Sequence, residues 1–242
     1  MKRKTAILTK LGVQLPKEAR ILDFGCGAGR TVYSLLDQGY TNTVGYDVKD
    51  RLELRDPVER SRFFTADPTG GGRLPVEDNS FDLIISEQVL EHVKDQVGML
   101  RELHRIMRPG GHALHVFPAR YCLIEPHIYV PLGGVLGHRW WYKLWALLGI
   151  RNEFQKGLSS DETADRNVFY FVAHLNYVPN LCYEIVWQRL GYEYKWIDQE
   201  NFDTSERATV RMVGRLNRTL PLIGWMNRTF HTRRVYLKKK DT

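Results

Sequence analysis

Residues 21–30 constrain the fold of this chain more than any other stretch. They form the apolar run Ile-Leu, then Asp23 and Phe, and then glycines at alternate positions, Gly25, Gly27 and Gly29. The apolar run predicts a buried strand, and the glycines let the backbone turn sharply and pass close to a ligand before a helix begins near Gly29. A nucleotide site in an α/β fold is the functional interpretation, and a plain strand-to-helix turn is the alternative.

Two residues narrow the choice of ligand for this turn. A dinucleotide-binding turn has its third glycine one position after Gly29, where this chain has Arg30, and it places a diphosphate at the helix N-terminus. Asp23 would repel that diphosphate, whereas a carboxylate suits a ligand with a positive end, such as S-adenosylmethionine (SAM). The stretch resembles the first motif of class I SAM-dependent methyltransferases. The resemblance implies that the cofactor is SAM and that it is bound by Asp23, Phe24, Gly25, Gly27 and Gly29.

Three further acids stand at the carboxyl ends of predicted strands, at the sheet edge where ligands of open α/β folds bind. Asp47 is expected to accept hydrogen bonds from the ribose hydroxyls, with a cap or turn role as the alternative. For Asp67 the resemblance implies a contact with the adenine amino group, although the glycine-rich insertion at residues 69–72 departs from the family pattern. Glu87 ends the next strand, which the resemblance implies opens toward the cofactor sulfur.

The order of predicted elements indicates an α/β fold. A short entry helix is expected over residues 5–19, and strands are expected at residues 21–22, 43–47, 62–67, 81–86, 112–117, 192–197 and 234–237. The resemblance, nearly continuous from Arg20 to Pro118, implies a Rossmann-like doubly wound sheet of seven strands, mostly parallel with the last strand antiparallel. We expect one domain over residues 1–242, with a helical lid and substrate insert after strand five at 119–178 and a basic helical insert before the last strand at 199–232.

Histidines near the sheet edge and in the lid are the catalytic candidates. His127, which follows Glu125 in the lid, and His92, which follows Glu91, are the two general bases that we consider. Some relatives carry Glu-x-x-Glu-His at this point and bind a divalent cation. Here the first glutamate is replaced by Gln88, and an amide is a poorer ligand for a hard cation than a carboxylate. We therefore expect no metal, with Glu91 and His92 orienting the adjacent helix and loop.

Composition and charge bear on partners and location. The three cysteines are isolated, which favours reduced thiols, and no apolar run is long enough for a signal peptide or a membrane span. The net charge of +7 arises mainly in the second half, which carries 18 Lys and Arg against 12 Asp and Glu. Arg207, Arg211, Arg215 and Arg218 share one helix face, and residues 207–240 contain ten basic residues and no acid. A solvated face, an anionic substrate, an anionic membrane surface and RNA all remain open as explanations.

Taken together, these features predict a cytoplasmic, biosynthetic SAM-dependent methyltransferase. We expect a small-molecule or glycan-type acceptor, with oxygen as the methylated atom. The aromatic lid sequence at 139–148 and the basic C-terminal half suggest that the acceptor is lipid-linked and met at the inner membrane face. The alternatives are an RNA methyltransferase that uses the arginine stripe and a SAM-binding scaffold without activity. The neutral first half and the absence of a base-flipping motif argue against nucleic acid.

Overall fold

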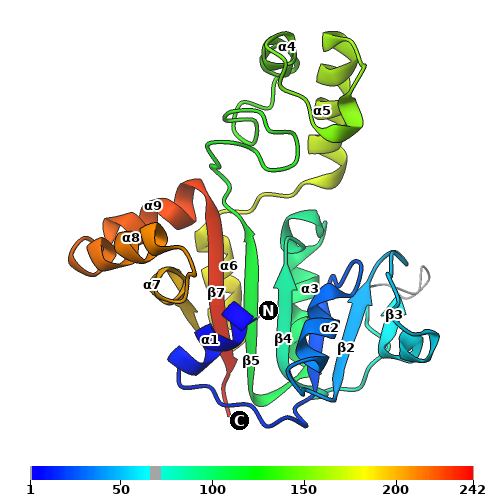
Figure 1. Cartoon of the computed structure of the whole chain (residues 1–242), viewed down its shortest axis with the longest axis vertical. Coiled ribbons are helices and arrows are strands. Elements are labelled where there is room, and N and C mark those ends of the chain that lie inside the picture. Colours follow the sequence, from blue (N-terminus) through cyan, green and yellow to red (C-terminus); the bar gives the residue numbers. More distant parts are fainter. Residues whose placement is uncertain (1, 66–71, 242) are drawn as a thin grey trace.

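A computed structural model describes residues 2–65 and 72–241, and its centre is a seven-stranded sheet (Figure 1). The strand order is β3-β2-β1-β4-β5-β7-β6. All neighbours from β3 to β5 are parallel, whereas β7 runs antiparallel to both β5 and β6. The strands are β1 Ile21–Phe24, β2 Thr43–Asp47, β3 Phe63–Thr65, β4 Phe81–Glu87, β5 Met107–Pro118, β6 Tyr192–Trp196 and β7 Thr232–Lys239. The predicted doubly wound fold with an antiparallel last strand is confirmed.

Helices cover both faces of the sheet because its strands are apolar on both sides. In β4, Ile84 packs in one core cluster with helices α3 (Gln96–Ile106) and α6 (Asn180–Arg189). Its neighbours Leu83 and Ile85 point the other way, into a second cluster that includes residues of α1 (Lys2–Lys10) and α2 (Arg30–Leu36). This three-layer arrangement leaves the carboxyl ends of the parallel strands free for a ligand.

Several predicted boundaries were wrong. The entry helix expected over residues 5–19 is α1, which ends at Lys10, and an irregular segment leads from there to β1. β5 begins five residues earlier than expected, because Met107 pairs with Phe81 and the chain through Gly110 and Gly111 stays in the strand with a register shift. In contrast, the expected bounds of β2 are those observed.

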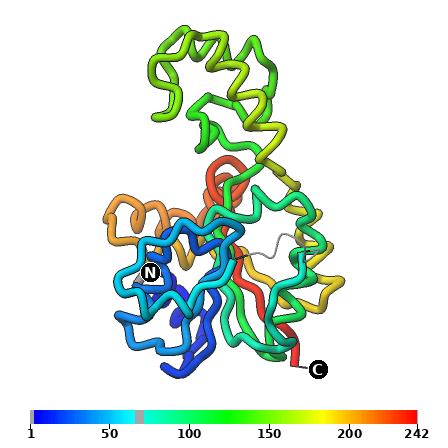
Figure 2. Tube along the Cα trace, turned by 90° about the vertical axis from the view of Figure 1, so that its right-hand side faces the viewer, coloured from blue at the N-terminus to red at the C-terminus, as the bar shows by residue number. Residues whose placement is uncertain are grey.

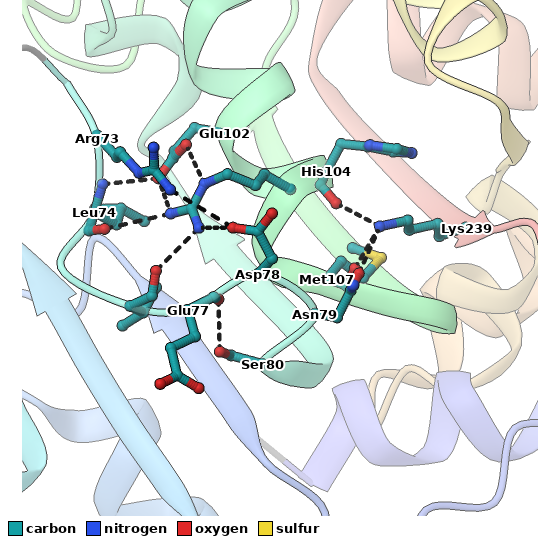
Figure 3. A network of polar contacts seen from close by, with 12 residues as sticks. Arg73, Leu74, Glu77, Asp78, Asn79, Ser80, Glu102, His104, Met107 and Lys239 are labelled. Atoms are coloured by element: carbon teal, nitrogen blue, oxygen red, sulfur yellow. Dashed lines mark hydrogen bonds and ion pairs between the residues drawn. The ribbon is translucent and has the colours of Figure 1, made fainter.

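A polar network fixes the loop that leads into β4 (Figure 3). Arg105 of α3 donates hydrogen bonds to Glu102 at 2.8 Å and to Asp78 at 2.6 Å. The buried Lys239 ammonium donates to Asn79 and to the carbonyls of residues 104 and 107 at 2.7–3.1 Å. This network lies at the amino end of β4, so it holds the end of the sheet opposite to the ligand edge.

Two helical inserts are added to the sheet. Residues 119–178 contain α4 (Arg139–Leu147) and α5 (Ser160–His174) and stand beyond the carboxyl end of β5 (Figures 1 and 2). This insert has a small core of its own, formed by Ile128, Val130, Tyr142 and Ala164. The second insert, between β6 and β7, contains α7 (Asp198–Asp203), α8 (Ala208–Thr219) and α9 (Leu222–Phe230). Within the described part of the chain, none of the helices has the length and apolarity needed to cross a membrane.

Candidate active site

The glycine turn after β1 has the backbone that its sequence predicts. Gly25, Gly27 and Gly29 all have left-handed φ angles, of 80°, 51° and 81°. A Cβ at Gly25 would collide with the side chain of Val89, and a Cβ at Gly29 would come within 2.9 Å of the Phe63 ring. A Cβ at Gly27 would meet nothing within 4 Å. Two glycines are therefore required by packing against the protein, and Gly27 faces open space at the ligand edge.

Asp23 is almost fully buried directly before this turn. Burial is the main reason that its pKa is raised to about 7, and the negative charge of Glu87 raises it further, while Lys4 opposes both. The Lys4 ammonium lies 2.6 Å from a carboxylate oxygen of Glu87. A buried carboxylate of this kind gains stability from a bound cation, which fits the ammonium end of SAM.

Asp47 closes the other side of the turn. One of its oxygens accepts a hydrogen bond from the Gly27 N–H at 2.8 Å, and the other accepts one from the Lys49 N–H at 3.1 Å. Each carboxylate oxygen has a further lone pair, so Asp47 can still accept hydrogen bonds from a ligand. Phe24 instead turns its ring into the core, stacked on Tyr46 with the ring centroids 5.4 Å apart. Asp67 lies outside the described residues.

The predicted catalytic histidines lie together. The rings of His92, in the short 3-10 helix after β4, and His127, in the insert, have their centroids 5.0 Å apart in an edge-to-face arrangement. His127 Nδ1 lies 2.7 Å from Glu125, whose carboxylate also accepts a hydrogen bond from the Tyr177 hydroxyl at 2.5 Å. We call Glu91, His92, Glu125, His127 and Tyr177 the polar centre.

Hydrogen-bond partners fix the proton positions in this centre. A carbonyl oxygen only accepts, so His92 Nδ1, 3.0 Å from the carbonyl of His174, carries the proton of a neutral ring. Burial lowers the pKa of His92. Burial alone would raise the pKa of Glu125, but its hydrogen bonds with His127, Tyr177 and the backbone lower it overall, so Glu125 is an ionised acceptor for His127 Nδ1. Both rings thus present Nε2 as the basic nitrogen.

Glu91 is buried without a partner. Among the described residues neither of its oxygens has a hydrogen bond, and burial raises its pKa to about 7. His92 Nε2 lies 4.0 Å from one of these oxygens. Ligand atoms of Glu91, His92 and His127 all lie within 4.8 Å of one another, a spacing that could hold a cation. Our expectation that no metal binds here stays a prediction.

The glycine turn and the polar centre flank the same loop. Val89 packs against Gly25, and Glu91 follows two residues later. Sequence reasoning found the two histidines, but it missed Tyr177. It also missed the ion pair between Lys4 and Glu87. No local spacing marks either contact, because each joins residues far apart in the chain.

The chain matches a protein-family profile and is similar to curated proteins. A sequence profile of a family described as a methyltransferase domain matches residues 2–195. The chain is similar to 27-O-demethylrifamycin SV methyltransferase of Amycolatopsis mediterranei, with 30% identity over 117 residues, which are 44% of this chain and 42% of that protein. It is also similar to tRNA U34 carboxymethyltransferase of Pseudoalteromonas atlantica, with 30% identity over 41% of this chain and 32% of that protein. The chain thus spans less than half the length of these curated relatives.

Solved structures share the whole fold at low sequence identity. The YcgJ protein of Bacillus subtilis aligns over 99% of this chain and 100% of its own, with a TM-score of 0.55 and 15% identity. A phosphoethanolamine N-methyltransferase of Haemonchus contortus, solved with S-adenosylhomocysteine, aligns over 100% of this chain and 53% of its own, with a TM-score of 0.55 and 14% identity. Because the family profile covers most of the chain, the protein belongs to the methyltransferase-domain family of SAM-dependent enzymes.

Proposed function

We propose that this protein transfers the methyl group of SAM to an oxygen of a small-molecule or glycan-type acceptor. The observation that carries the proposal is the polar centre, where His127 is oriented by an ionised glutamate and presents its free nitrogen beside His92. A hydroxyl acceptor must lose its proton during transfer, and an amine that is already neutral needs no such base. The paired imidazoles therefore favour an alcohol or phenol.

For the cofactor, we assign Asp23 to the ammonium of SAM and Asp47 to the ribose hydroxyls. Asp23 is a buried carboxylate directly before the glycine turn, and Asp47 keeps free lone pairs at the end of β2. Glu87, at the end of β4, forms the wall on the side of Asp23 opposite to Asp47, because β1 lies between β2 and β4. Gly27 leaves the space that a bound ligand needs. Asp67, which we expected at the adenine, remains an expectation from sequence.

The chemical step in this proposal is an in-line displacement at the methyl carbon. SAM supplies the electrophilic methyl and a good leaving group, so the protein has to align the acceptor and exclude water. His127 takes the hydroxyl proton at Nε2 while the bond from oxygen to carbon forms. Glu125 stabilises the resulting imidazolium through Nδ1, and the Tyr177 hydroxyl holds Glu125 in place. We assign His92 to positioning the acceptor oxygen.

The test measures methyl transfer from labelled SAM to a panel of phenols, sugars and amines, with His127→Gln compared with His138→Gln. His138 is an exposed histidine of the same insert, so its substitution controls for general effects on the insert. We expect His127→Gln to lower kcat by roughly 10²- to 10⁴-fold, the range for loss of a general base, with the Kd of SAM unchanged by calorimetry. Methylation of nitrogen or carbon only, or full activity of His127→Gln, would refute the oxygen assignment.

The proposal extends to a cytoplasmic, biosynthetic role with a lipid-linked acceptor. An RNA methyltransferase is the second candidate, favoured by the arginine row of α8 and by the relative that is named for tRNA. A non-catalytic scaffold would bind SAM but transfer no methyl to any acceptor of the panel. Replacing the panel of acceptors by RNA transcripts tests the RNA methyltransferase, which would transfer the methyl group to RNA.

A further inference from the structure

Helices α8 and α9 form a hairpin whose outer surface is apolar. Six large apolar side chains on these helices and their connection are each 46–60% exposed. We call them the apolar ridge: Met212, Leu216, Leu220, Leu222, Trp225 and Met226. A soluble domain rarely leaves so many neighbouring apolar side chains in water unless the surface has a partner.

The orientation of the hairpin is fixed by its inner face. Gly214 is buried so close to Phe202 of α7 that a Cβ there would come within 2.7 Å of that side chain. Gly224 is buried against Asn217, whose side-chain oxygen accepts a hydrogen bond from the Gly224 N–H at 2.6 Å. Small residues face the protein and large apolar ones face outward, the reverse of an ordinary surface helix. The packing of the inner face therefore holds the apolar ridge in its exposed position.

Positive charge borders this ridge. Arg218 pairs with Asp203 at 2.9 Å, and Arg211 donates to the carbonyls of Ser205 and Glu206. Arg215 is exposed and makes no polar contact with any residue that the structure describes. With no acid between residues 207 and 240, the partner of this surface must accept both apolar side chains and cations.

We propose that the α8–α9 hairpin docks the protein on an anionic membrane, with the apolar ridge among the acyl chains near the surface and the arginines on the head groups. Helices of twelve and nine residues are too short to span a bilayer but have the length of an interfacial anchor. RNA would use the arginines but leave the ridge in water, because most protein contacts to nucleic acid are polar. An anionic membrane uses both features.

The docking surface is connected to the insert that supplies the polar centre. The N–H of Leu123, near the start of the insert, donates to the Phe230 carbonyl at the end of α9 at 3.1 Å. Leu123 and Ile124 are themselves 60% exposed, so two further exposed apolar side chains lie between this contact with α9 and Glu125. One consequence of the docking rests on the proposed function: the methyl acceptor reaches the polar centre from the membrane.

The test is sedimentation of the full chain with vesicles of phosphatidylglycerol and phosphatidylcholine in equal parts, against vesicles of phosphatidylcholine alone. We expect binding to the anionic vesicles only, weakened by salt. Arg215→Gln is expected to lower the partition coefficient about fivefold, the usual effect of one basic residue at an anionic surface. Arg189→Gln, an exposed arginine on α6, is the matched control and should have no effect.

The ridge is tested separately. Leu216→Ser combined with Met226→Ser should abolish binding, whereas Leu181→Ser, at an exposed leucine of α6, should not. Because these side chains are exposed, the variants are expected to keep the wild-type melting temperature. Trp225→Phe should keep binding but remove part of the fluorescence quenching by brominated lipids.

The outcomes separate the two proposals. Binding to anionic vesicles that depends on both Arg215 and the ridge supports the inference. Binding to RNA but not to vesicles, or to neither, overturns it. SAM binding and methyl transfer to a water-soluble acceptor are measured in the same preparations, so a protein that is active but does not bind vesicles refutes only the docking. A protein that binds vesicles but transfers no methyl refutes only the proposed function.

Discussion

The buried carboxylate of Asp23 makes the affinity for SAM depend on pH. Its pKa is raised from 3.8 to about 7, chiefly by burial, so the ligand-free protein at neutral pH holds this group about half protonated. If the SAM ammonium binds the ionised form, the apparent Kd equals the intrinsic Kd divided by the ionised fraction. At about pH 6 only about one-tenth is ionised, so the Kd should be about fivefold higher than at about pH 7, and about tenfold higher for each further unit.

The same shift has a consequence for stability. Because the pKa of Asp23 is higher in the folded than in the unfolded protein, protonated Asp23 stabilises the fold relative to ionised Asp23. This stabilisation is fully present below about pH 3.8 and is lost as the pH rises through about 7. Between about pH 6 and about pH 8 this removes about 1.4 kcal/mol from the unfolding free energy of the ligand-free protein, an amount that saturating SAM should restore. Asp23→Asn removes the ionisation and should flatten both pH profiles.

Titration calorimetry measures both the affinity and the protons released. We expect about half a proton released per SAM bound at about pH 7, obtained from buffers of different ionisation enthalpy. Asp23→Asn should raise the Kd at about pH 7.5 roughly 10- to 100-fold, the effect of losing a hydrogen bond to a charged group. Glu193→Gln, an exposed carboxylate on β6, is the control. A Kd that does not change from about pH 5 to about pH 7, or an Asp23→Asn variant of wild-type affinity, would refute the reasoning.

Three further predictions test the site. Gly27→Ala and Gly12→Ala both place alanine at a left-handed φ in open space, so each should cost about 1 kcal/mol in chemical denaturation, but only Gly27→Ala should weaken SAM binding in calorimetry. Tyr177→Phe should lower kcat with little change in the Kd of SAM, because Glu125 loses the hydroxyl that holds it, and an unchanged kcat in the transfer assay would contradict that role. Dialysis against a chelator should leave methyl transfer unchanged, in line with Gln88 replacing a carboxylate, and activity restored only by an added divalent cation would overturn this expectation.

The sheet was predictable because parallel strands such as β2 and β4 combine an apolar run with an acidic residue at the carboxyl end. Residues 43–47 are apolar enough for a strand that is covered on both faces and end in an acid, and β2 has those bounds. The Leu83-Ile84-Ile85 run of β4 is continuous rather than alternating, as a parallel strand with helices on both faces requires. The glycine turn was predictable for a different reason, since left-handed backbone and close approach leave glycine as the residue that fits.

The errors arose where local sequence conflicts with pairing across the sheet. Pro109 and the two glycines after it are typical of a turn, but pairing with β4 keeps them in β5, with Gly110 in the left-handed region. The entry helix is shorter than its apolar pattern indicates, because the segment before β1 packs its apolar residues without a helix; Val13 is buried there. Propensity is a weak guide when tertiary contacts decide the conformation.

The polar centre could not be predicted as a unit because it lies where the insert meets the loop after β4. Gln96 of α3 donates to the carbonyls of Leu90 and Asn176 at 2.7 Å each, and the Asn176 N–H donates to the Glu91 carbonyl at 2.7 Å. These bonds attach the end of the insert to the loop that carries Glu91, and Tyr177 follows directly. The insert has its own core, so its contribution to the centre depends on how it docks. An acceptor bound against both His92 and His127 would contact the loop after β4 and the insert, so acceptor binding and the docking of the insert should stabilise each other.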